Sequence, residues 1–236
     1  MGSDFKTIPV IDIGPLVEKI DDPKMANDPE VKEVIRMLDK ACKDAGFFYV
    51  KGHGIADSLV KEVRDITHKF FGLPYEDKLK IKMTPASGYR GYQRIGENIT
   101  KGKPDMHEAI DCYREIEPGT YGTLGKPLEG SNLWPDYPSH FKELMEEYLC
   151  LLRDLSRKIM HGIALALGGS ADAFEGLLTL VNQDDDIHAL EVLDVATQVP
   201  GLYRYPLGQD LEIFSFSICT PKIRSGFDLE VLQNAF

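Results

Sequence analysis

Hydrophobic positions recur at steps of three and four residues in three segments of this chain, at residues 29–46, 57–72 and 139–167. That spacing places the apolar side chains on one face of a helix, so the sequence predicts three amphipathic helices. Asp28, directly before the first segment, and Asp57, the first residue of the second, are predicted N-caps, because a short carboxylate can accept hydrogen bonds from the first free amides of a helix. A glycine follows each segment or ends it, which is typical of a helix C-terminus.

Shorter apolar runs predict strands between and after these helices. Residues 84–104, rich in glycine and tyrosine, are predicted to form a loop. The predicted strands cover residues 8–13, 47–50, 109–115, 177–181, 188–192 and 211–216. Helices with a few strands come first and short strands come last, a pattern typical of an α+β fold and different from alternating βαβ units.

Charge and composition narrow the function classes. The 236 residues carry 27 Lys and Arg against 38 Asp and Glu, a net charge of −11. Such a chain repels phosphate backbones and anionic lipid, so we expect no nucleic-acid or membrane partner. Four well-separated cysteines include no CxxC pair, and the N-terminus has no basic stretch followed by an apolar one. The sequence therefore predicts a cytoplasmic protein with free thiols.

Several sequence blocks in a fixed order resemble the plant-type Fe(II)/2-oxoglutarate-dependent dioxygenase family. They are IPVIDIGPL at 8–16, ACKDAGFFYVKGHGI at 41–55, FFGLPYEDKLKI at 70–81, GYRGYQRIGENITKGKPDMHEAIDCYRE at 88–115 and IALALGG at 163–169. The resemblance implies a helical N-terminal region packed on a double-stranded β-helix of the jelly-roll or cupin-like type, here incomplete. It divides the chain into the dioxygenase N-terminal region at 1–115, a linker with the long helix at 116–176, and a truncated β-helix remnant at 177–236.

The same resemblance implies Fe(II), held by an H-x-D pair and a distant histidine, and 2-oxoglutarate as co-substrate. Where relatives carry H-T-D-Y-G, this chain places Asp172 and Phe174 at the ligand positions. None of its six histidines is followed two residues later by Asp or Glu, and none comes after His188. Segments are missing near the Glu175–Leu177 junction and again between Ser215 and Thr220. We therefore predict no catalytic or metal-binding residue, and neither cofactor is expected to be bound by this chain.

The remaining candidate residues form two groups. Arg224 lies in a segment similar to the family's S-P-x-x-R-x-S motif, which implies a contact with the 2-oxoglutarate carboxylate; a surface arginine is the alternative. Tyr89, Tyr92 and Gln93 lie in a loop that flanks the substrate pocket in relatives, with plain packing as the alternative.

Two further groups could hold a cation. His107, Glu108 and Asp111 share a short segment, and His188 follows the acidic run at 184–186. We expect ordinary polar packing for the first and a solvated turn for the second.

Three functions stay open on the sequence alone. The resemblance implies an oxidoreductase acting on a small organic metabolite, although the missing ligands place catalysis in doubt. A non-catalytic chain could instead dock on a partner, such as a full-length relative, through strand edges left unpaired by the missing segments. A shortened product without function is the third.

Overall fold

A computed structural model describes residues 8–46, 48–100, 102–113, 115–120 and 129–174, and these fall into two compact units. The first unit contains residues 8–54 and 154–174, and the second contains residues 55–153. The long helix α6 (Phe141–Ala166) belongs to the second unit up to Arg153 and to the first unit from Asp154 onward. Helices and three two-stranded sheets in the described residues confirm the α+β class.

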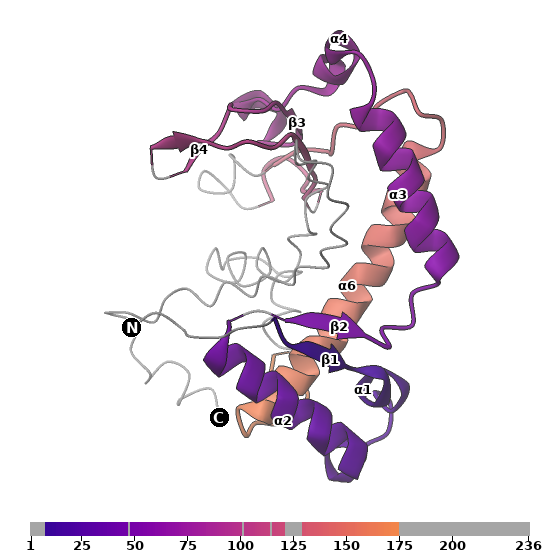
Figure 1. The fold of residues 1–236 in the computed structure, drawn as a ribbon, viewed down its shortest axis with the longest axis vertical. Helices are drawn as coiled ribbons and strands as arrows, with labels where there is room; N and C mark the ends of the chain where they lie inside the picture. Colours follow the sequence, from indigo (N-terminus) through magenta and orange to yellow (C-terminus); the bar gives the residue numbers. More distant parts are fainter. Residues whose placement is uncertain (1–7, 47, 101, 114, 121–128, 175–236) are drawn as a thin grey trace. The chain divides into compact units, whose positions relative to one another are not determined.

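In the first unit, strand β1 (Val10–Asp12) lies beside β2 (Tyr49–Lys51) (Figure 1). The two strands pair in parallel, with Ile11 opposite Val50. Parallel neighbours need a long connection, and here it is helical. It contains α1 (Gly14–Glu18), the 3-10 turn η1 (Met25–Asn27) and α2 (Pro29–Asp44). The predicted strand at 8–13 is confirmed in its centre. Strand β2 begins two residues later than the strand predicted at 47–50. Helix α1 was missed because five residues are too few to show a helical period.

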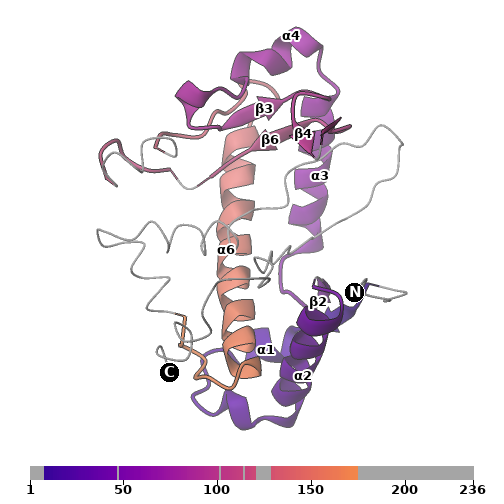
Figure 2. The ribbon, with the colours of Figure 1, turned by 90° about the vertical axis from the view of Figure 1, so that its left-hand side faces the viewer.

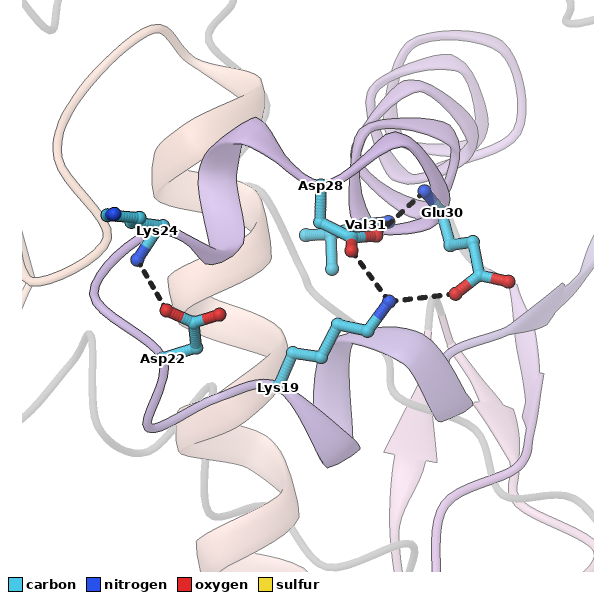
Figure 3. Close-up of polar contacts among 6 residues, drawn as sticks. All are labelled: Lys19, Asp22, Lys24, Asp28, Glu30 and Val31. Atoms are coloured by element: carbon cyan, nitrogen blue, oxygen red, sulfur yellow. Dashed lines mark hydrogen bonds and ion pairs between the residues drawn. The ribbon is translucent and has the colours of Figure 1, made fainter.

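The start of α2 is held as the sequence predicts. Asp28 Oδ1 accepts hydrogen bonds from the amides of Glu30 at 2.9 Å and Val31 at 3.2 Å. Lys19, directly after α1, places its Nζ 2.7 Å from Asp28 Oδ2 and 2.8 Å from Glu30 Oε2 (Figure 3). The lysine therefore joins the end of α1 to the cap of α2. These partners hold the pKa of Asp28 below its usual value, with the Lys19 bond as the largest cause.

The last turns of α6 pack closely on this unit. Gly162 leaves so little room that a Cβ added there would lie 2.8 Å from a methyl group of both Leu16 and Leu38. Leu16 and Leu38 are fully buried, as are Ile11 and Val31. A glycine in mid-helix is thus explained by the close approach of α1 and α2 to α6.

In the second unit, α3 (Asp57–Phe71) runs beside the first turns of α6 (Figures 1 and 2). The rings of Phe70 and Phe141 are 5.6 Å apart there. The prediction that Asp57 caps α3 was wrong. Ala56 is the cap residue and makes no side-chain hydrogen bond, whereas Asp57 is already in the first turn, where its charge favours the helix dipole. Helix α6 begins two residues after the predicted Ser139, because His140 has a φ of +63°, which an α-helix does not allow.

The predicted loop at 84–104 contains three short strands, which corrects that prediction. Strand β3 (Gly91–Gln93) pairs antiparallel with β6 (Ala109–Asp111), and β4 (Ile99–Thr100) pairs with β5 (Lys103–Pro104). Runs of two or three residues are too short to show an alternating pattern. Strand β6 is shorter than the predicted 109–115. Before β3 come the short helix α4 (Tyr75–Lys78) and the 3-10 turns η2 (Leu79–Ile81) and η3 (Pro85–Ser87).

The predicted β-helix remnant at 177–236 lies outside the described residues, as do its three predicted strands. The predicted boundaries at 115/116 and 176/177 stay predictions. Among the helices that the structure describes, none has both the length and the apolar character needed to span a bilayer.

Candidate functional site

The β3–β6 ladder carries two of the three predicted pocket residues, Tyr92 and Gln93. Strand β3 is anchored on both sides, since the amide of Met83 donates to the carbonyl of Tyr92 at 2.9 Å while β6 pairs along its other edge. Gly91 makes this crossing possible. It has a φ of +114°, and a Cβ added there would lie only 2.3 Å from the carbonyl oxygen of Ile81.

One face of the ladder is buried around Tyr92. Its ring packs edge-on against Phe70 at 6.1 Å, and its hydroxyl donates to Glu108 Oε2 at 2.6 Å. Lys78 Nζ reaches the same oxygen at 2.6 Å and also donates to the carbonyl of Phe71 at 3.2 Å. Burial, and then the Glu108 contact, raise the pKa of Tyr92, so the phenol keeps its proton. Glu108 thus has the polar packing predicted for it.

The opposite face carries Gln93 and Asp111, the last residues of the two strands. In the antiparallel register Gln93 faces Ala109 and Asp111 faces Gly91, so the two side chains are diagonal neighbours. The amide Nε2 of Gln93 donates to Asp111 Oδ2 and lies 3.2 Å from Met83 Sδ. Asn98 in turn donates to Gln93 Oε1. Burial raises the pKa of Asp111 from 3.8 to about 6.

A fully buried arginine lies next to this ladder. The Nη1 of Arg90 donates to the carbonyls of Gly88 at 3.3 Å and Glu129 at 3.5 Å, and its guanidinium lies 5.5 Å from the ring centre of Tyr113. Burial also raises the pKa of the Cys112 thiol to about 12, which keeps it protonated and unreactive. Sequence reasoning missed Arg90 and Lys78, because Glu129 and Glu108, with which they bond, lie 39 and 30 residues away and nothing local indicates the pairing.

The other predicted residues are dispersed. Tyr89 is 47% exposed and has a positive φ of 58°, so it is not joined to the buried face of Tyr92. Its role in a pocket, like those of Tyr92 and Gln93, stays a prediction. Arg224 and His188 lie outside the described residues.

The positions that correspond to the iron ligands of relatives do not form a metal site. Asp172 lies in the turn after α6, where its side chain bonds with Ser170 and its pKa falls below the usual value for that reason. The segment is separate from α6, which ends at Ala166. Across the residues that the structure describes, no three His, Cys, Asp or Glu side chains gather closely enough to hold a metal. Because the whole sequence also lacks an H-x-D or H-x-E pair, the donor groups present do not fit Fe(II).

Comparison with known proteins places these observations in a family. Residues 8–137 match the family described as the N-terminal region of the non-haem dioxygenase in morphine synthesis. The chain is 58% identical to homoarginine-6-hydroxylase 2-ODD-233 of Oryza sativa subsp. japonica, covering 94% of this chain and 81% of the rice protein. It is 54% identical to homoarginine-6-hydroxylase 2-ODD-C23 of Glycine max, covering 91% and 79%.

Among solved structures, the full-length T7H of Neurospora crassa in complex with alpha-KG matches with a TM-score of 0.56 and 27% identity. The match covers 74% of this chain and 52% of T7H, so the chain spans about half the length of that structure.

The alignments to the plant relatives are longer than this chain. The alignment with the rice protein runs over 267 positions, whereas 94% of 236 residues is only about 222. About 45 aligned positions of the rice protein therefore face gaps here. The soybean alignment runs over 261 positions against about 215 residues of this chain, which leaves a similar number.

Proposed function

Because this chain belongs to the plant family of Fe(II)- and 2-oxoglutarate-dependent dioxygenases, we propose that it is a shortened form of a homoarginine-6-hydroxylase-type enzyme. In this proposal it keeps the N-terminal scaffold and lacks the iron site. Its relatives are oxidoreductases named for a small, cationic amino acid, and that amino acid is the substrate class we assign to its lineage.

The missing ligands carry the proposal. Iron in such a site needs imidazole and carboxylate donors arranged on one side, with adjacent positions left open. No histidine of this chain is followed at the second position by an acid, and Asp172 and Phe174 stand where the resemblance expects ligands. An aspartate bonded to Ser170 and a phenylalanine cannot replace an H-x-D pair. No catalytic step through iron follows from these residues.

The alignments support loss of segments and not gradual drift. About 45 aligned positions are absent, yet identity to the rice relative is still 58% over the whole alignment of 267 positions. Drift would have lowered identity throughout, whereas excision leaves the flanking blocks intact. Docking on a full-length relative, the alternative predicted from the sequence, would use residues 177–236, outside the described part, and stays a prediction.

Iron retention and turnover test the proposal together. The purified full chain is loaded anaerobically with Fe(II), desalted and assayed for bound iron, and then for succinate release with 2-oxoglutarate, ascorbate and L-homoarginine. The rice homoarginine-6-hydroxylase serves as the positive control. We expect no retained iron and no succinate above the protein-free background.

A chimaera provides the matched variant. Inserting the rice segment that faces the gaps should restore iron binding if the rest of the scaffold is intact. Stoichiometric iron in the unmodified chain, or homoarginine-dependent succinate release, would refute the proposal.

A further inference from the structure

Glu108 lies directly before strand β6 and Asp111 is the last residue of that strand, and the two carboxylates have very different surroundings. Glu108 is 7% exposed and has both a lysine ammonium and a phenol hydroxyl within 2.6 Å. Asp111, three residues later on the other face, is half-buried, and within the described residues its carboxylate accepts a hydrogen bond from the neutral amide of Gln93 alone. No Lys or Arg side chain in the described part of the chain forms an ion pair with it. A carboxylate drawn out of water without a cation is costly, so proteins seldom leave one in place without a use.

The groups around Asp111 hold its carboxylate in a fixed orientation. Gln93 donates to Oδ2, and Gln93 is itself held by the Asn98 amide at its Oε1. Gln93 is 8% exposed, and both strands that carry the pair are tied by the β3–β6 register. The second oxygen, Oδ1, accepts no hydrogen bond from the described residues, and it is not one of the buried polar atoms that lack a partner, so it is accessible to solvent. Gln93 thus holds Oδ2, whereas Oδ1 can accept a hydrogen bond from a ligand.

The shape of this acceptor favours an organic cation over a metal ion. Asp111 offers one carboxylate, and its neighbours are amides whose donors already point at Gln93 and Asp111. A metal ion would need several more ligands than this cluster supplies. A guanidinium presents several N–H donors in a plane, which match a carboxylate and a nearby amide oxygen such as that of the exposed Asn98.

We propose that Asp111 anchors the guanidinium of a homoarginine-like amino acid, with Gln93 and Asn98 holding the carboxylate in position. The substrate class rests on the function proposed above, and the assignment of Asp111 rests on the geometry of the β3–β6 ladder. The guanidinium forms the ion pair that Asp111 lacks among the described residues. Binding should therefore depend on the charge of the ligand and on the charge of Asp111.

A pair of nearly isosteric ligands tests the charge requirement without any mutation. The full chain, without iron, is titrated by calorimetry with L-homoarginine and with L-homocitrulline, in which a neutral urea replaces the guanidinium. Loss of a charge-assisted hydrogen bond should weaken binding about tenfold or more. Equal affinities for the two ligands, or no homoarginine binding by the folded chain, would overturn the proposal.

Two matched variants test the residue. Asp111→Asn keeps the size and one acceptor oxygen but removes the charge, and it should weaken homoarginine binding about tenfold or more. Glu97→Gln removes a charge from the same segment, at a carboxylate already 3.2 Å from Lys82, and should bind like the unmodified chain. Far-UV circular dichroism confirms that each variant is folded. If Asp111→Asn binds as tightly as the unmodified chain, or if Glu97→Gln loses as much affinity, the assignment fails.

Failure of the Asp111 assignment can be distinguished from failure of the proposed function. Absence of homoarginine binding in an iron-free, inactive chain overturns the role of Asp111 and leaves the proposed function standing. Homoarginine-dependent turnover would overturn the proposed function whatever Asp111 does.

Discussion

Replacing Asp111 by Asn should stabilise this protein at neutral pH, although the change removes a side-chain charge from a hydrogen-bonded cluster. Burial raises the pKa of Asp111 to about 6 in the folded chain, against 3.8 for an exposed aspartate. Above pH 6 the carboxylate is charged in both states, and the folded state bears the full cost of removing it from water. Each step of one in pKa corresponds to about 1.4 kcal/mol, so the cost is at most about 3 kcal/mol.

The sign of the pH dependence follows from proton binding. Between about pH 4 and 6 the folded chain holds a proton on Asp111 that the unfolded chain has released, so this group makes stability fall as pH rises through that window. Below about pH 4 both states are protonated and the contribution vanishes. The advantage of Asp111→Asn should therefore be near zero at pH 4 and grow to a plateau of about 2 to 3 kcal/mol above pH 7.

Urea unfolding followed by circular dichroism, at pH values from 4 to 8, measures this difference directly. Glu97→Gln is the control, because the pKa of Glu97 is lowered on folding, whereas that of Asp111 is raised. Burial acts to raise the pKa of Glu97, but the Arg94 amide and Lys82 lower it more, so the charged form is favoured on folding. The Glu97→Gln variant should therefore be no more stable than the unmodified chain at neutral pH. An Asp111→Asn variant that is less stable than the unmodified chain at pH 7, with no change in the difference down to pH 4, would refute the reasoning.

Three further substitutions have outcomes that the structure predicts. Lys78→Met leaves the buried Glu108 carboxylate without its cation and should cost about 3 to 5 kcal/mol in urea unfolding, whereas Lys80→Met, at an exposed ion pair, should change little. Gly162→Ala should cost about 1 to 3 kcal/mol through overpacking, partly offset by about 1 kcal/mol of helix propensity; a Tm equal to that of the unmodified chain would show that the neighbouring leucines yield. Asp28→Ala removes the cap of α2 and should lower the Tm by a few degrees, and an unchanged Tm would contradict the role of that cap.

Local features of the sequence predicted the three long helices well. The apolar spacing located α2, α3 and α6 to within a few residues, and Asp28 was correctly predicted as a cap. Each of these depends on residues within a turn or two of one another, so the information is present in the local sequence. Asp57 failed as a predicted cap because two neighbouring residues could both start the helix, and the backbone at Ala56 decides between them.

Less of the candidate site could be predicted from the sequence. The ladder between β3 and β6 joins strands of three residues, too short for an alternating pattern, across an intervening hairpin. The pair of Lys78 and Glu108 spans 30 residues. The sequence does not indicate whether either of these charged side chains is exposed at the surface or buried with a partner.

The sequence by itself determined the family and the absence of an H-x-D pair, because both depend only on which residues are present and in what order. It did not determine that Glu108 is paired with Lys78, whereas Asp111, three residues later, is partly buried and forms no ion pair with any residue that the structure describes. A strand turns its side chains to two faces, and what covers each face comes from distant segments. Only the tertiary structure therefore decided which carboxylate stabilises the fold and which is left to meet a ligand.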